Sequence, residues 1–182
     1  MNYYIEYKQE ALNSVLSNRL FHGSNTYIKG SLKPHKSFHY DKYVYATSDY
    51  SYALVRAGKF DIDNFAIKED YNGVIYTLVE LKENAFEEVF NTEGYIYLVD
   101  SKYFFKTDKC MPYEYISKYK CKIIQTFKIS NVLEEIKKYE NIHYKLIAYG
   151  SEEEKEYWNT VNGGKDGYLK RRKERAKKIK GD

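Results

Sequence analysis

The sequence predicts an α+β fold in which strands fill the middle of the chain and helices lie mainly toward its two ends. Three observations lead to this prediction. Of the 182 residues 43% are hydrophobic, and 22 tyrosines and 9 phenylalanines are more aromatic residues than disordered chains contain. Only 10 glycines and 2 prolines are present, which excludes collagen-like and low-complexity structure. Strand-like segments follow one another without a helix after each, an order that favours α+β over alternating βαβ units.

The first third of the chain alternates between helix and strand patterns. Apolar side chains recur on one side of the segment 8–18, which is typical of a short amphipathic helix. Ser48 or Asp49 can N-cap a second helix, because either side chain accepts backbone N–H bonds. The elements expected are, in order, a helix at 8–18, a strand at 19–23, a polar loop through 42, a strand at 43–47 and a helix ending near 58.

Strand patterns dominate the rest of the chain up to residue 150. β-Branched and aromatic residues predict strands at 73–81, 94–99, 114–117, 122–129 and 143–149. Ser130 is expected to cap a helix at 131–139, and helix resumes at Glu152. The sequence therefore divides into a domain at 1–150, with its core at 19–130, and a helical C-terminal extension at 151–182.

Several classes of protein are excluded by what the sequence lacks. No segment approaches the roughly 18 uncharged apolar residues of a membrane span. The first residues carry neither the basic nor the apolar part of a signal peptide, so a soluble, cytoplasmic protein is expected. Two cysteines, Cys110 and Cys121, cannot form a disulfide framework or a four-ligand zinc site by themselves, and no metal is expected.

The positive charge of the chain is concentrated at its C-terminal end. Residues 165–182 contain nine Lys or Arg and three Asp or Glu, whereas residues 1–164 contain 21 basic and 23 acidic residues. The glycines of Asn162-Gly163-Gly164 separate the two parts. The basic segment 165–180 is either a solvated terminal helix or a surface that binds a nucleic-acid backbone.

One short motif carries more chemical information than any other. The sequence contains no GxGxxG, GxxxxGK[ST], GxSxG or HExxH pattern. Phe21-His22-Gly23-Ser24, in contrast, closes a strand with three residues suited to a planar ligand. Gly23 lets such a ligand approach the backbone, and the imidazole of His22 and hydroxyl of Ser24 can bond ribose hydroxyls. Further along the chain, Tyr45 offers a ring for stacking and Glu114 a carboxylate at the start of a strand.

These segments, in this order, resemble the ADP-ribosyltransferase superfamily of the diphtheria-toxin and poly(ADP-ribose) polymerase type, whose triad is His, Tyr and usually Glu. Phe-His-Gly-Ser matches the first motif of the polymerases, while Val44-Tyr45-Ala46 and Glu114-Tyr115-Ile116 are similar to the second and third. The Gly73-Val74-Ile75-Tyr76 segment is similar to the small rifampin ADP-ribosyltransferases. The resemblance covers residues 19–130.

The resemblance implies two facing antiparallel sheets with NAD⁺ between them, and ADP-ribose transfer with release of nicotinamide. It implies catalytic roles for His22, Tyr45 and Glu114, and contacts to NAD from Gly23, Ser24, Ala46 and Tyr52. Glu93 and Glu88 remain alternative acidic residues, and comparison with the rifampin enzymes points to Glu87 or Glu88. The acceptor, whether protein, nucleic acid or small molecule, is left open.

Two departures from the polymerase pattern lie on the helix after Tyr45. The polymerases have a serine and a second stacking tyrosine there, at positions that correspond to Ala53 and Arg56. Tyr50 or Tyr52 is a candidate substitute for that tyrosine. Two other functions fit the same fold: an RNA 2′-phosphotransferase-like activity, and a non-catalytic module that binds NAD, another nucleotide or nucleic acid.

Overall fold

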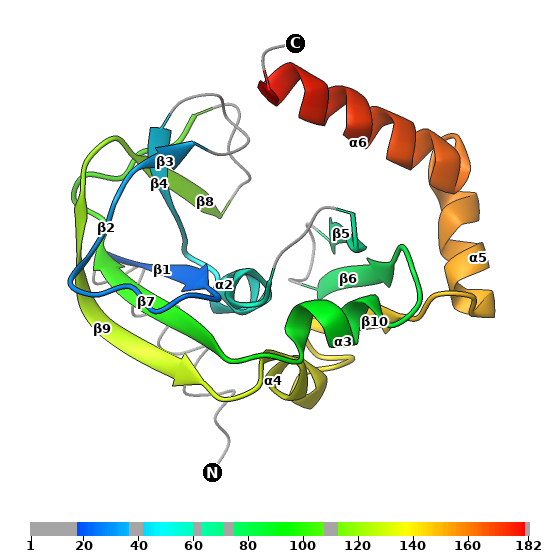
Figure 1. The fold of residues 1–182 in the computed structure, drawn as a ribbon, viewed down its shortest axis with the longest axis horizontal. Coiled ribbons are helices and arrows are strands. Elements are labelled where there is room, and N and C mark those ends of the chain that lie inside the picture. The colour runs from blue at the N-terminus through cyan, green and yellow to red at the C-terminus, as the bar shows by residue number, and fades with distance from the viewer. Residues whose placement is uncertain (1–17, 37–41, 60–62, 71–74, 108–112, 181–182) are drawn as a thin grey trace.

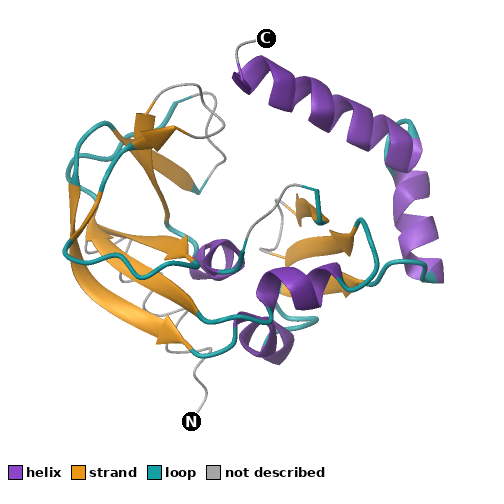
Figure 2. Ribbon diagram, in the orientation of Figure 1, coloured by secondary structure: helices purple, strands orange, loops and turns teal. Residues whose placement is uncertain are grey.

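Two β-sheets and five helices make up the part of the chain that the structure, a computed structural model, describes: residues 18–36, 42–59, 63–70, 75–107 and 113–180. The α+β class expected from the sequence is confirmed (Figures 1 and 2). The helix expected at 8–18 and Cys110 lie outside the described residues.

The larger sheet has seven strands and is curled and antiparallel (Figure 1). Its order is β2-β9-β7-β1-β4-β3, with β8 paired to β4. The bounds of these strands are β1 Arg19–Ser24, β2 Ser31–Leu32, β3 His35–Lys36, β4 Lys42–Thr47, β7 Gly94–Asp100, β8 Glu114–Ser117 and β9 Cys121–Ile129.

The strand β1 has a different relation to each of its two neighbours. All six of its residues are in register with β7, from Arg19↔Asp100 to Ser24↔Tyr95. With β4 it shares one register position, Phe21↔Thr47. Beyond that position the two strands separate, and the residues that leave the pairing on β1 are those of the His-Gly-Ser motif.

The smaller sheet has three strands in the order β10-β6-β5 and is mixed. β5 (Phe65–Asp70) pairs with β6 (Ile75–Glu80) in antiparallel fashion, whereas β10 (Tyr144–Ile147) pairs with β6 in parallel. The expectation of two antiparallel sheets is therefore wrong for the second sheet. β10 enters it through the connection that contains α4, and such a crossover can deliver a parallel strand.

Helices fill the space between the two sheets. α2 (Tyr50–Ala57), α3 (Ala85–Phe90) and α4 (Val132–Lys138) lie there in Figure 2. They share one hydrophobic core with residues of both sheets, including Phe21 of β1 and Phe65 of β5. The interior that separates the sheets is thus a packed core of aromatic and aliphatic side chains.

The helix caps follow local sequence rules, with one correction. Asp49 caps α2, since its carboxylate accepts bonds from the N–H groups of Ser51 and Tyr52 at 2.8 and 3.4 Å. Asn131 caps α4, because its side chain accepts the Glu134 N–H at 3.1 Å. The expectation that Ser130 caps this helix is wrong by one residue.

Two C-terminal helices cover the outer side of the smaller sheet. α5 (Glu152–Thr160) and α6 (Gly164–Lys180) are separated at the predicted Asn162–Gly163 break. Trp158, Tyr168 and Leu169 from these helices pack on Ala66, Val79, Leu81 and Ile147. No helix in the described ranges is both long and apolar enough to cross a membrane.

Candidate functional site

The His-Gly-Ser motif borders a pocket of about 300 Å³ where β1 and β4 separate. His22, Gly23 and Ser24 all line it, so three of the predicted site residues lie together. The other lining residues come from the segment after β1, from β2 to β4 and from the end of α2: Asn25, Ile28, Leu32, Lys33, His35, Val44, Arg56 and Gly58.

His22 is held in one orientation by the backbone of the tyrosine strand. Its Nδ1 donates a hydrogen bond of 2.7 Å to the carbonyl oxygen of Tyr45, which requires the hydrogen to be on Nδ1. Burial lowers the pKa of His22 to about 4, and the positive charge of Arg56 acts in the same direction. At neutral pH the imidazole is therefore uncharged, and its Nε2 is a hydrogen-bond acceptor.

Gly23 is required by the packing of α2 against β1. A Cβ atom at this position would lie 1.9 Å from the carbonyl oxygen of Ala53 and 2.9 Å from the backbone nitrogen of Ala57. These are backbone atoms of a buried helix, which cannot move aside as a flexible side chain would. The glycine of the motif therefore has a structural role in addition to any contact with a ligand.

The pocket is lined by positive charge. Lys33 and Arg56 are cationic, and none of the lining residues in the part of the chain that the structure describes is acidic. The guanidinium of Arg56 donates from Nη2 to the hydroxyl of Tyr52 at 2.7 Å and lies 5.1 Å from the centroid of that ring. Tyr52 thus orients Arg56, and the pocket has the charge that suits an anionic ligand.

The ring of Tyr45 lies on a different face of the sheet from His22. Successive side chains of a strand point to opposite faces of the sheet, and the neighbours of Tyr45, Val44 and Ala46, pack in one hydrophobic cluster with Tyr97. The ring of His22 lies on the face of that cluster, 6.2 Å from the ring of Tyr97. The Tyr45 ring instead lies 5.8 Å from the ring of His35. Tyr45 thus approaches the pocket through its carbonyl group and through His35, while Ala46 is buried in the core.

Glu114 is the most buried of the candidate carboxylates. It begins β8, is 8% exposed and faces Thr47 across the β4–β8 pair. Since β8, β4 and β1 are successive strands, Glu114 is separated from β1 by about 10 Å, twice the usual interstrand spacing. It shares a sheet face with Thr47 and hence with Tyr45. Glu114 does not line the pocket.

The alternative carboxylates lie at the surface and are paired with lysines. Glu93 accepts from Lys128 at 2.5 Å and from the hydroxyl of Tyr95, and these bonds lower its pKa. Glu88 pairs with Lys82, and Glu87 lies 3.7 Å from Lys137. Burial and the position on a strand next to β4 favour Glu114 over these residues.

Some pocket residues carry little or no local sequence signal. Lys33 and His35 belong to a segment expected to be loop, where β2 and β3 form two-residue strands instead. Arg56 differs from the polymerase pattern, which has a tyrosine at the corresponding position. The sequence gives one indication for Arg56, since this residue lies near the C-terminal end of a predicted helix, where a cation is favourable.

Comparison of the chain with protein-family models, with curated proteins and with solved structures finds no match. The pocket and the strands around it are therefore the features from which a function can be inferred.

Proposed function

We propose that this protein binds NAD⁺ in the pocket beside His22 and transfers ADP-ribose to an acceptor, with release of nicotinamide. One observation supports the proposal above the others. The His22-Gly23-Ser24 motif, which resembles that of ADP-ribosyltransferases, borders a pocket whose charged lining residues, among those that the structure describes, are all cationic. NAD⁺ has a diphosphate that such a lining would neutralise, and ribose hydroxyls that a neutral histidine can bond.

The roles proposed for His22, Lys33 and Arg56 follow from their positions in the pocket, whereas the role proposed for Glu114 follows from the resemblance to the ADP-ribosyltransferases. His22 accepts a hydrogen bond from a ribose hydroxyl through Nε2, and Tyr45 is a positioning residue whose carbonyl fixes the imidazole. Lys33 and Arg56 contact the diphosphate. Glu114 stabilises the positive charge that develops on the ribose as the bond between the ribose carbon and nicotinamide breaks. The electron pair of that bond leaves with nicotinamide. The ribose carbon then bonds to a nucleophilic atom of the acceptor, which loses its proton.

Incubation with labelled NAD⁺ and a cell lysate tests the proposal, with nicotinamide release and covalent transfer of label as readouts. The Glu114→Gln variant is expected to lose about 100- to 1000-fold in turnover, because an electrostatic stabiliser of the transition state is removed, while NAD⁺ binding persists. Glu93→Gln and Glu88→Gln are matched controls that should keep full activity. Undiminished turnover in Glu114→Gln, or loss in Glu93→Gln alone, contradicts this assignment.

A second candidate function, a non-catalytic module that binds NAD or another nucleotide, is favoured by the position of Glu114 outside the pocket lining. The same experiment separates the two. Binding of NAD⁺ to the wild-type chain that depends on His22 and Arg56, without any release of nicotinamide, supports the module and contradicts the enzyme.

A further inference from the structure

The basic helix α6 is attached to the smaller sheet in one orientation. The Arg172 guanidinium donates from Nη1 to the carbonyl oxygen of Phe65 at 2.9 Å and to the Tyr168 hydroxyl at 2.8 Å. Tyr168 and Leu169 also pack on the apolar cluster of this sheet. The side of α6 that carries Tyr168 and Arg172, which are one turn apart, therefore faces the sheet.

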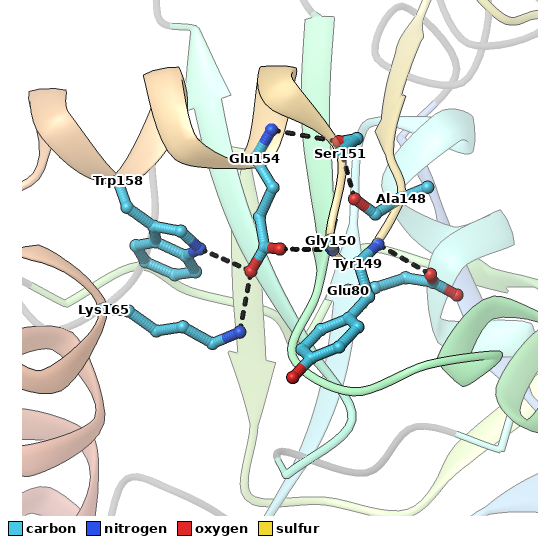
Figure 3. A network of polar contacts seen from close by, with 8 residues as sticks. All are labelled: Glu80, Ala148, Tyr149, Gly150, Ser151, Glu154, Trp158 and Lys165. Atoms are coloured by element: carbon cyan, nitrogen blue, oxygen red, sulfur yellow. Dashed lines mark hydrogen bonds and ion pairs between the residues drawn. The ribbon is translucent and has the colours of Figure 1, made fainter.

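A second attachment joins the start of α6 to α5 (Figure 3). The Glu154 carboxylate, 6% exposed, accepts bonds from Lys165 Nζ at 2.7 Å, Trp158 Nε1 at 2.9 Å and the Gly150 N–H at 2.6 Å. Although burial raises the pKa of Glu154, these bonds outweigh it and lower the pKa overall. Lys165 is thus used in an internal ion pair, and α6 starts from a fixed point.

A row of lysines lies on a different side of α6 from Tyr168 and Arg172. Lys170, Lys173 and Lys177 are spaced at i, i+3 and i+7, so they share one side of α6, and all three are exposed. They line a surface hollow of about 450 Å³ together with Asp166, Leu169 and Glu174. The row extends over about 10 Å at 1.5 Å per residue, a length that corresponds to about three phosphates of one duplex strand.

We propose that the lysine row of α6 (Lys170, Lys173 and Lys177) docks a nucleic-acid backbone and thereby presents nucleic acid as the acceptor of ADP-ribose; the acceptor role rests on the proposed function. Charge complementarity carries the choice of occupant, since residues 165–182 have a net charge of +6 and residues 1–164 a net charge of −2. A membrane surface is disfavoured. A helix that lies in a membrane interface needs an apolar face, and Tyr168 and Leu169 of α6 are packed on the protein.

The test compares two triple variants that lose the same charge. The α6 variant combines Lys170→Gln, Lys173→Gln and Lys177→Gln. The control variant changes three exposed lysines near the β8–β9 turn and combines Lys118→Gln, Lys120→Gln and Lys122→Gln. Binding of labelled duplex DNA, single-stranded DNA and RNA is measured without NAD⁺ at several salt concentrations. The α6 variant should bind about 10-fold or more weakly than the wild type. The slope of log affinity against log salt concentration should be smaller by about two to three, because each contact to a duplex phosphate contributes about 0.9 to that slope. The control variant should bind like the wild type.

Three results would overturn the proposal: no binding of any nucleic acid by the wild type, equal affinities for the two variants, or an α6 variant that loses only its binding to phosphatidylserine vesicles. Nicotinamide release without nucleic acid, measured in parallel, should be unchanged in the α6 variant. If release occurs but nucleic acid does not bind, the inference about α6 fails alone. If nucleic acid binds through α6 but NAD⁺ is never cleaved, the proposed function fails and the docking surface stands. Label transferred to nucleic acid requires both.

Discussion

Arg56 is, with Lys33, one of the cationic residues named in the pocket lining. The resemblance to the polymerases would place a stacking ring at this position, and the hydroxyl of Tyr52 orients the guanidinium of Arg56. Its planar guanidinium can contact two phosphate oxygens at once, whereas a tyrosine there would stack on a ring of the ligand. We infer that ligand binding at this end of the pocket depends more on charge than on stacking.

The Arg56→Gln variant should bind ADP-ribose about 10- to 100-fold more weakly than the wild type, because a hydrogen bond to a charged group contributes about 1.5–3 kcal/mol. Titration calorimetry with ADP-ribose checks this, and Arg56→Lys, which keeps the charge but not the fork, should be intermediate. Lys59→Gln is the control, since Lys59 is exposed and does not line the pocket. Equal affinity of the Arg56→Gln variant and the wild type would remove Arg56 from the site.

The burial of His22 predicts a specific pH dependence of stability. The unfolded chain binds a proton at His22 near its ordinary pKa of 6.5, whereas the folded protein does so only near pH 4. The unfolded state therefore binds more protons between these values, and stability falls as the pH is lowered from 6.5 toward 4. Urea unfolding at pH 7 and pH 5 should show that the free energy of unfolding falls less between these pH values in His22→Gln than in the wild type. Ser24→Ala, which removes no titratable group, should lose as much stability as the wild type; a loss unchanged by His22→Gln would contradict the burial of the imidazole.

At the scale of elements, the contact between β1 and α2 determines the shape of the pocket. Ala53 is fully buried where α2 crosses Gly23. The position of Arg56 one turn later, and of Gly58 at the end of α2, follows from this contact. Asp49 fixes the other end of the helix and also accepts a hydrogen bond from the Tyr76 hydroxyl at 2.6 Å. The pocket therefore depends on the exact seating of one helix.

Gly23→Ala tests this contact. The added Cβ would lie 1.9 Å from a backbone oxygen of α2, so the helix or the strand must shift, at a cost of about 1–3 kcal/mol in the free energy of unfolding. Chemical denaturation measures this change in the free energy of unfolding. Ser24→Ala, which removes an adjacent hydroxyl without adding volume, is the control and should change stability little. A Gly23→Ala variant as stable as the wild type would show that α2 does not pack on β1 this closely.

The same elements show which features a sequence can predict. Segments with a strong local pattern, such as β7, β9 and the Asp49-capped α2, were predicted because alternation and capping are properties of neighbouring residues. The sequence does not predict α3 or β5, and the parallel pairing of β10 with β6 departs from the antiparallel sheet that is expected, because pairing is decided by tertiary contacts. The pocket divides in the same way. His22, Gly23 and Ser24 are contiguous and were found together, whereas Lys33 and Arg56 meet them only through the separation of β4 from β1.

At the scale of the whole molecule, charge and packing are arranged on different parts. The large curled sheet carries the pocket, and the small sheet carries α5 and α6 with most of the net positive charge (Figure 1). The predicted boundary near residue 150 falls at the start of α5. The packing across this boundary, however, is apolar and includes the single tryptophan of the chain.

Truncation distinguishes a separate appendage from an integral part of the fold. A chain that ends at Gly150 loses the cover of Ala66, Val79, Leu81 and Ile147 by α5 and α6. Removal of one large buried aromatic side chain such as Trp158 costs about 3–5 kcal/mol, so the truncated chain should unfold at a markedly lower urea concentration. A chain that ends at Glu174 is the control. It keeps Trp158, Tyr168, Leu169 and Arg172, and it should unfold at the same urea concentration as the wild type.

If truncation at Gly150 leaves the unfolding midpoint unchanged, the small sheet does not need these helices, and residues 151–182 form an independent extension as the sequence predicts. If the midpoint falls as expected, α5 and α6 belong to the folding unit, and the lysine row is held on the same cooperative structure as the pocket.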